Sequence, residues 1–118
     1  MNFKTDIPIY RQIINYAFSC ILSGAWMPGE KIPSVRELAV QMAVNTHTVL
    51  KAFDYLQLHN LIVSRRGMGY YLADDAKNRV QEIRREEFFN TRLKELFSEM
   101  EMLGISIDEV VCRYNQRN

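Results

Sequence analysis

The chain has 118 residues, of which 47% are hydrophobic and 11% aromatic, and its 15 basic and 14 acidic side chains give a formal net charge of +1. This length supports one compact core with a small appendage and excludes a two-domain enzyme. The near-neutral charge excludes a histone-like polycation, so any contact with nucleic acid must come from locally clustered cations.

Signals for membranes, export and metals are missing from the sequence. The longest uncharged apolar run, residues 16–22, is much shorter than the roughly 20 residues of a membrane span, and the N-terminus lacks a signal-peptide pattern. We therefore expect a cytoplasmic protein without membrane contact. Cys20 and Cys112 are far apart, and His47 and His59 have no partners at ligand spacing, so we expect no disulfide, no metal and no cofactor.

The first helix is predicted to begin around residues 6–8, where Asp6 offers an N-cap and Pro8 falls in the first turn, and to end at Ser23-Gly24. Two apolar stripes run along it, so the helix should be covered by the core on one side and by the C-terminal helix or a partner subunit on the other. The stripes consist of Ile9, Ile13, Ala17 and Ile21, and of Tyr10, Ile14, Phe18 and Leu22.

Two short helices should follow in close succession. Residues 34–37, Ser-Val-Arg-Glu, fit a capping box at the start of a second helix. Residues 45–48, Asn-Thr-His-Thr, offer a second N-cap, which opens a third helix that runs to about Asn60. Because only a few residues separate them, the two helices predict a helix-turn-helix.

The third helix should bury one side and present a polar side to a groove. His47 and Lys51 fall opposite the predicted core residues, with Asn45, Thr46 and Thr48 gathered at the helix N-terminus. Asp54 lies farther along the polar side, where it would repel phosphate, so the N-terminal half should enter DNA. Leu58 should pack under a neighbouring segment. The predicted core residues are Val49, Ala52, Phe53 and Leu56.

A hairpin is predicted next, from extended runs over residues 61–66 and 70–73 joined by Gly67-Met68-Gly69. The glycines let the tip approach another surface closely, and Arg65 and Arg66 place positive charge beside it. Residues 31–72 carry five basic and two acidic side chains, a local charge of +3. The expected fold class is α+β and mostly helical: a winged helix-turn-helix domain over residues 1–74.

The remaining residues, 75–118, should form a two-helix segment. A long helix with an intermittent apolar stripe should stop at Gly104, and Ser106 should cap a short final helix. Such helices bury little surface alone, so they either fold back on the first domain or pair with a second chain, and the size of the stripe favours the second chain. The predicted dimerisation residues are Phe89, Leu93, Leu96, Phe97, Met100 and Leu103.

Three motifs together resemble the DNA-binding domain of GntR-family bacterial transcription regulators. They are PGEKIPSVRELA over residues 28–39, VNxxTVxKA over residues 44–52, and RGxGYY over residues 66–71. The match covers about residues 8–74 in order and without gaps. The short helical tail is similar to that of the YtrA-type subfamily, whose tails serve for dimerisation.

The resemblance implies a homodimer that binds a palindromic operator, usually as a repressor. In such proteins the residues matched by Ser34 and Arg36 meet the DNA backbone or a base, and the glycines matched by Gly67 and Gly69 form a wing tip at the minor groove. Thr46-His47 departs from the residues common in relatives, so the base sequence that is read should differ. The positions expected in the major groove are Asn45, Thr46, His47, Thr48 and Lys51.

Plainer interpretations exist for several of these residues. His47 and Lys51 are each compatible with an ordinary solvated surface, and Arg65 and Arg66 with charges that protect an edge strand. Ser34 serves as an N-cap whatever else it does. Met68 at the tip is either an apolar residue without a role in binding or a wedge that inserts into the minor groove.

Two alternatives to a DNA-binding regulator are a protein-binding module and an enzyme. A winged helix that contacts protein instead of DNA is compatible with the near-neutral charge. An enzyme is disfavoured because no nucleophile, base and orienting group occur at recognisable positions. The sequence marks no pocket for a small-molecule effector, and it leaves activation open beside repression.

Overall fold

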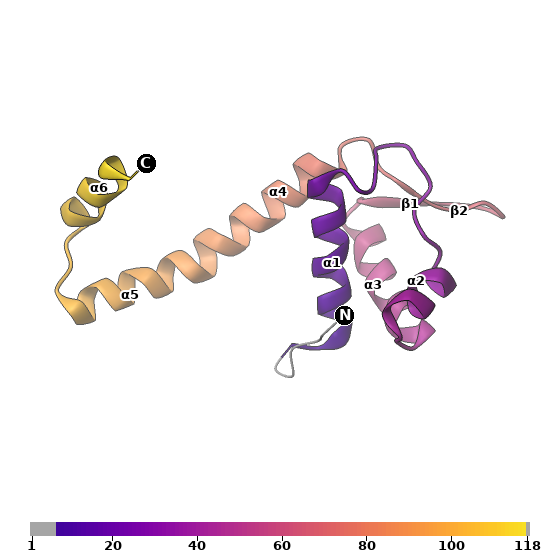
Figure 1. Ribbon diagram of the computed structural model, residues 1–118, viewed down its shortest axis with the longest axis horizontal. Helices are drawn as coiled ribbons and strands as arrows, with labels where there is room; N and C mark the ends of the chain where they lie inside the picture. Colours follow the sequence, from indigo (N-terminus) through magenta and orange to yellow (C-terminus); the bar gives the residue numbers. More distant parts are fainter. Residues whose placement is uncertain (1–6, 118) are drawn as a thin grey trace. The chain divides into compact units, whose positions relative to one another are not determined.

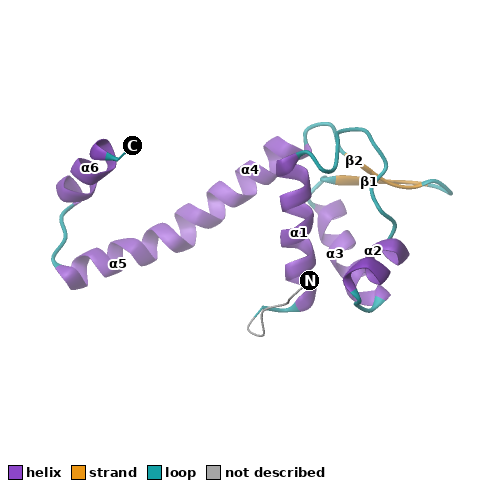
Figure 2. Cartoon of the chain, viewed as in Figure 1, coloured by secondary structure: helices purple, strands orange, loops and turns teal. Residues whose placement is uncertain are grey.

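The computed structural model describes residues 7–117 and divides the chain into two compact units, the first ending at Gln81 and the second beginning at Glu82. Figures 1 and 2 show the elements in chain order. They are α1 (Ile9–Ser23), α2 (Val35–Met42), α3 (Thr46–Leu58), β1 (Ile62–Arg65), β2 (Gly69–Leu72), α4 (Ala76–Glu87), the π-helix η1 (Phe88–Arg92), α5 (Leu93–Leu103) and α6 (Ile107–Gln116). The predicted class, a mostly helical winged helix-turn-helix followed by a helical tail, is confirmed.

The core of the first unit forms around α3, which is contacted by α1, α2 and β1. Its four predicted core residues are fully buried, and no polar or charged side chain is buried among the residues that the structure describes. Phe53 of α3 also meets Tyr70 of β2 edge to face, with 4.9 Å between the ring centroids. Removal of this apolar surface from water stabilises the unit and fixes the orientation of α3 relative to the hairpin.

Helix α1 begins at Ile9, with Pro8 as its N-cap and no side-chain cap. Asp6, the expected N-cap, lies outside the described residues. The helix ends as predicted, because Gly24 adopts a left-handed conformation (φ +83°) that only glycine reaches without strain. The chain then turns back, and the Trp26 backbone N–H donates to the Cys20 carbonyl at 3.0 Å.

The turn between α2 and α3 depends on one strained residue. Ala43 has φ +55° and ψ +47°, and its N–H donates to the carbonyls of Ala39 and Val40 at the end of α2. A left-handed alanine costs about 1–2 kcal/mol because its Cβ crowds the next carbonyl oxygen. The short connection between the two helices is thus made at the expense of backbone strain.

The hairpin has the predicted position and a third partner that the sequence did not indicate. β1 and β2 pair antiparallel, with Ile62 opposite Leu72 and Arg65 opposite Gly69. On the other edge of β2, residues 29–32 run alongside it, and Lys31 forms a bridge with Tyr71. Three backbone hydrogen bonds of 2.9–3.0 Å hold this segment, including the one from the Ile32 N–H to the Tyr70 carbonyl. Residues 28–30 themselves form a turn, closed by the Glu30 N–H, which donates to the Met27 carbonyl at 3.1 Å, and the chain is extended after it.

The first unit extends past residue 74, where the sequence suggested a boundary, because Ala76 and Val80 of α4 are fully buried in it. Backbone helical structure continues without a break through α4, η1 and α5. The predicted stop at Gly104 is confirmed by its left-handed conformation, and the Ser106 Oγ accepts the Glu109 N–H at 3.2 Å to cap α6.

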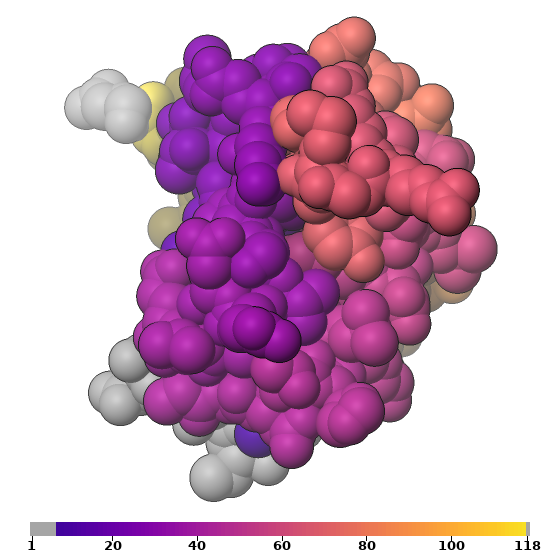
Figure 3. All heavy atoms as spheres, turned by 90° about the vertical axis from the view of Figure 1, so that its right-hand side faces the viewer, coloured from indigo at the N-terminus to yellow at the C-terminus, as the bar shows by residue number. Residues whose placement is uncertain are grey.

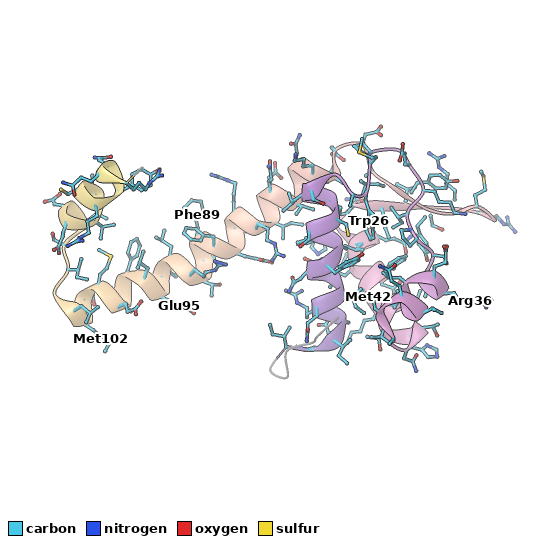
Figure 4. All side chains as sticks on the ribbon, in the orientation of Figure 1. Trp26, Arg36, Met42, Phe89, Glu95 and Met102 are labelled. Carbon is cyan, nitrogen blue, oxygen red and sulfur yellow. The ribbon has the colours of Figure 1, made fainter. Side chains whose placement is uncertain are left out.

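The second unit leaves most of its apolar side chains in solvent, as Figure 4 illustrates with Phe89 and Met102. Among the six predicted dimerisation residues, Met100 is only 9% exposed and Leu93 is half-buried, so the chain itself covers both to a large extent. The other four are exposed; they are Phe89, Leu96, Phe97 and Leu103.

Candidate nucleic-acid interface

The N-terminus of α2 carries the predicted capping box. The Ser34 Oγ accepts the Glu37 N–H at 3.0 Å, and the Ser34 N–H donates to Glu37 Oε1 at 3.2 Å. The hydrogen bond from the Ser34 backbone N–H to the carboxylate lowers the pKa of Glu37 below its usual value, and the Ser34 side chain and the charge of Lys31 act in the same direction. The Ser34 hydroxyl therefore accepts from the Glu37 N–H and also interacts with the Glu37 carboxylate, so its first role is to cap the helix. Arg36 is exposed on the outer side of α2 (Figure 4).

The N-terminus of α3 is capped by Asn45, whose Oδ1 accepts the His47 N–H at 2.8 Å. The cap leaves the side-chain amide of Asn45 as a donor. Thr46 and His47 are exposed and Thr48 is half-buried, so the structure brings these predicted residues together on the first turn. Unpaired N–H groups at a helix N-terminus attract phosphate, which suits this turn to contact with DNA.

Lys51 follows one turn after His47, and it has a partner that the sequence did not suggest. Its Nζ lies 4.0 Å from the ring centroid of Tyr10 on α1, a cation–π contact. The side chain remains exposed, so the contact orients the ammonium group without burying it.

Two leucines on the outer side of α3 differ from expectation. Leu58, expected to pack under a neighbouring segment, is 77% exposed, so this prediction is wrong: none of the described residues covers the last turn of the helix on that side. Leu50 was not singled out from the sequence, and it is 41% exposed in the N-terminal half.

The hairpin forms a wing with a glycine on each side of its tip. Gly67 (φ +73°) and Gly69 (φ +101°) adopt conformations that favour glycine, and Met68 between them is exposed. The Arg65 guanidinium lies 4.2 Å from the ring centroid of Tyr71, and Arg66 is exposed. Figure 3 shows this wing, in salmon, projecting from the surface, with α2 and the turn after it, in purple and magenta, on the same face.

Lys31 is a basic residue of this surface that the sequence did not place there. It lies on the strand-like segment beside β2, and its Cε is 3.0 Å from the position that a Cβ on Gly69 would occupy. The exposed Lys31 thus adds its charge to the wing beside Gly69. Its position follows from the pairing with Tyr71, which no local sequence signal could indicate.

The cations of these elements form no side-chain ion pair within the part of the chain that the structure describes. The two side-chain ion pairs found in residues 7–117 both lie on or next to α4: Arg79 with Asp75 at 2.7 Å and Arg84 with Glu87 at 3.2 Å. We call the five cations of α2, α3, the wing and the segment beside it the basic surface; none of them has such a pair in the described structure, and they are Lys31, Arg36, Lys51, Arg65 and Arg66. All five are exposed, and only Lys31 acts on a nearby carboxylate, that of Glu37, so together they favour a polyanion.

The described residues contain no group of three or more His, Cys, Asp or Glu side chains arranged to hold a metal ion. None of the helices formed by residues 7–117 is both long and apolar enough to cross a bilayer.

A helix-turn-helix with two capped N-termini, followed directly by a hairpin with uncompensated cations, defines the class of winged-helix DNA-binding proteins. Residues 9–72 match the family described as "Bacterial regulatory proteins, gntR family". The chain therefore belongs to the GntR family, as its three motifs indicated.

Individual relatives agree with this membership. The chain is 34% identical to the HTH-type transcriptional repressor YtrA of Bacillus subtilis over 107 residues, which is 91% of this chain and 82% of YtrA. Among solved structures it is similar to a GntR family transcriptional regulator from Listeria monocytogenes (TM-score 0.76, 32% identity, 98% of this chain and 100% of that one). It is also similar to AraR(DBD) in complex with operator ORR3 (TM-score 0.56, 33% identity, 62% of this chain and 88% of that one).

Family and fold together make the chain a DNA-binding transcription regulator and not an enzyme. The alternative of a winged helix that contacts protein instead of DNA finds no support among these relatives.

Proposed function

We propose that this chain is a homodimeric repressor that binds a palindromic operator. The N-terminal half of α3 enters the major groove, and the wing lies at the adjacent minor groove. A regulator of this kind acts on the chromosome, so we place it in the cytoplasm.

The observation that carries the proposal is the basic surface. Its five cations lie on α2, on α3, on the wing and beside it, and the cap of α3 leaves the Asn45 side-chain amide as a donor for phosphate. Asn45, Thr46, His47 and Thr48 provide polar groups at the same end of α3, where a recognition helix meets base edges. The binding of AraR(DBD), a smaller relative, to an operator supports the same use of this fold.

The dimer is supported by the apolar side chains of the second unit. Among the described residues, more than half of the large exposed apolar side chains lie between residues 88 and 114. We define the arm surface as the four exposed residues Phe89, Leu96, Phe97 and Leu103. A second copy of the chain offers the same apolar surface, and a two-fold axis lets each patch cover the other.

Repression follows when the dimer occupies its operator. A two-fold symmetric dimer places its two recognition helices in half-sites about one helical turn apart. A dimer seated on a promoter in this way blocks polymerase, and the similarity to the repressor YtrA supports this outcome over activation.

The test is selection of bound fragments from random double-stranded DNA at near-physiological salt, read by sequencing. The full chain should enrich a two-fold symmetric site, and Lys51→Ala should lose that enrichment. Lys77→Ala is the matched control, because Lys77 is an exposed lysine on α4, outside the proposed interface. Equal enrichment by Lys51→Ala and Lys77→Ala would contradict the assignment of Lys51, and a folded chain that enriches no sequence would contradict the proposed function.

A further inference from the structure

Leu50 lies in the part of α3 that is proposed to enter the major groove, yet its side chain is apolar. It is one helical turn from Thr46 and from Asp54, both exposed, and it is itself 41% exposed. Of the buried residues of this helix, Ala52 falls on the opposite side, while Phe53, three residues on, is a neighbour of Leu50 at the edge of the core. Leu50 therefore borders the core of the first unit but still leaves part of its side chain in solvent.

The surroundings of Leu50 indicate what would cover it. The adjacent Lys51 belongs to the basic surface, and the capped N-terminus of α3 lies one turn away. Positive charge and a helix N-terminus on the same turns favour a polyanion and disfavour an apolar protein surface. Double-stranded DNA is the partner that fits both the charge and the proposed function.

The groups that DNA offers to a leucine are few. Base edges in the major groove present hydrogen-bond donors and acceptors, which leucine cannot satisfy, and one apolar group, the C5-methyl of thymine. A leucine placed against cytosine or against purine edges would instead leave polar groups without partners.

We propose that Leu50 is a specificity-determining residue that contacts the C5-methyl group of one thymine in each half-site. This inference rests on the proposed function, because it requires α3 to lie in the major groove. It assigns a thymine to the base pair that faces the second turn of the recognition helix.

The experiment removes the methyl group from the DNA and the side chain from the protein. Single thymines of the selected operator are replaced by deoxyuridine, which lacks only the C5-methyl, and affinities are measured by fluorescence anisotropy. One thymine per half-site should be sensitive, with about a fourfold loss for one substitution and about a fifteenfold loss when both half-sites are changed, as expected for uncovering one methyl group each.

The same measurements are made with the variant Leu50→Ala. Leu58→Ala is its matched control, since Leu58 is an exposed leucine on the same helix but in the C-terminal half. Leu50→Ala should bind the unmodified operator more weakly and should respond equally to thymine and deoxyuridine. Leu58→Ala should keep the full deoxyuridine penalty. Both side chains are exposed, so both variants should retain the helical circular dichroism and melting temperature of the parent chain.

The outcomes distinguish a failure of the Leu50–thymine contact from a failure of the proposed DNA-binding function. Loss of the deoxyuridine penalty in Leu50→Ala alone supports the contact. A chain that binds its operator but shows no sensitive thymine, or a penalty that persists in Leu50→Ala, overturns the contact and leaves the proposed function intact. A folded chain that binds no DNA sequence specifically overturns both.

Discussion

The role of Lys31 can be tested through the salt dependence of operator binding. Lys31→Met removes the charge and keeps an unbranched stem beside Gly69, where the Lys31 Cε now lies against the wing. The backbone bridge between residue 31 and Tyr71 should remain, because it uses no side-chain atom. Any change in binding then reports the charge and not the shape of the wing.

The magnitude follows from the number of cations. If all five residues of the basic surface in both subunits contact phosphate, log affinity should fall against log salt with a slope of about −9, since each contact contributes about −0.9. Removing Lys31 from both subunits should leave a slope of about −7. Between about 50 and about 200 mM salt, the affinity of the variant should therefore fall about twelvefold less than that of the parent.

The assay is fluorescence anisotropy of a labelled operator at four salt concentrations in this range. Lys77→Met provides a control with the same change of charge on α4 and should keep the parental slope. A Lys31→Met slope equal to that of the parent would show that Lys31 does not contact phosphate and would refute its assignment to the interface.

Three further predictions concern stability and assembly. Ala43→Gly should raise the urea midpoint, because release of left-handed strain of about 1–2 kcal/mol outweighs the added freedom of glycine in the unfolded chain, about 0.4–1 kcal/mol; an unchanged or lower midpoint would show that the turn is not strained. The lowered pKa of Glu37 means that its carboxylate stabilises the fold above the ordinary glutamate pKa, near 4.3, and that this contribution is lost as pH falls through the lowered value. The advantage of the parent chain over Glu37→Gln in urea unfolding should accordingly be larger at neutral pH than near pH 3, and a constant difference would contradict the assigned hydrogen bonds. Phe97→Glu should shift sedimentation from dimer to monomer, while Asn90→Glu, which adds the same charge at an exposed polar site, should not; equal behaviour of the two would remove Phe97 from the arm surface.

Features that depend on a few neighbouring residues could be predicted from the sequence. The capping box at Ser34, the N-cap at Asn45 and the stop at Gly104 are confirmed, because each is completed by hydrogen bonds or backbone angles within four residues. The buried side of α3 was likewise evident, since helical periodicity alone decides which residues share a face.

Packing outside a helix could not be predicted in the same way. Leu58 and Met100 both sit at apolar positions of helices, yet the first is exposed and the second is buried. Periodicity shows which residues share a side, but only the positions of other segments show whether that side is covered.

The sequence by itself determined the class of protein, the order of its elements and the polar turn of α3, because these follow from local caps, periodicity and turn residues. Only the tertiary structure decided the surroundings of the cations. Lys51 meets Tyr10 and Lys31 pairs with Tyr71 across some 40 residues of chain, contacts that arise when the core brings distant segments together. The physical reason is that each of these lysines is positioned by a residue that only the folded chain brings next to it, and that residue is distant in sequence.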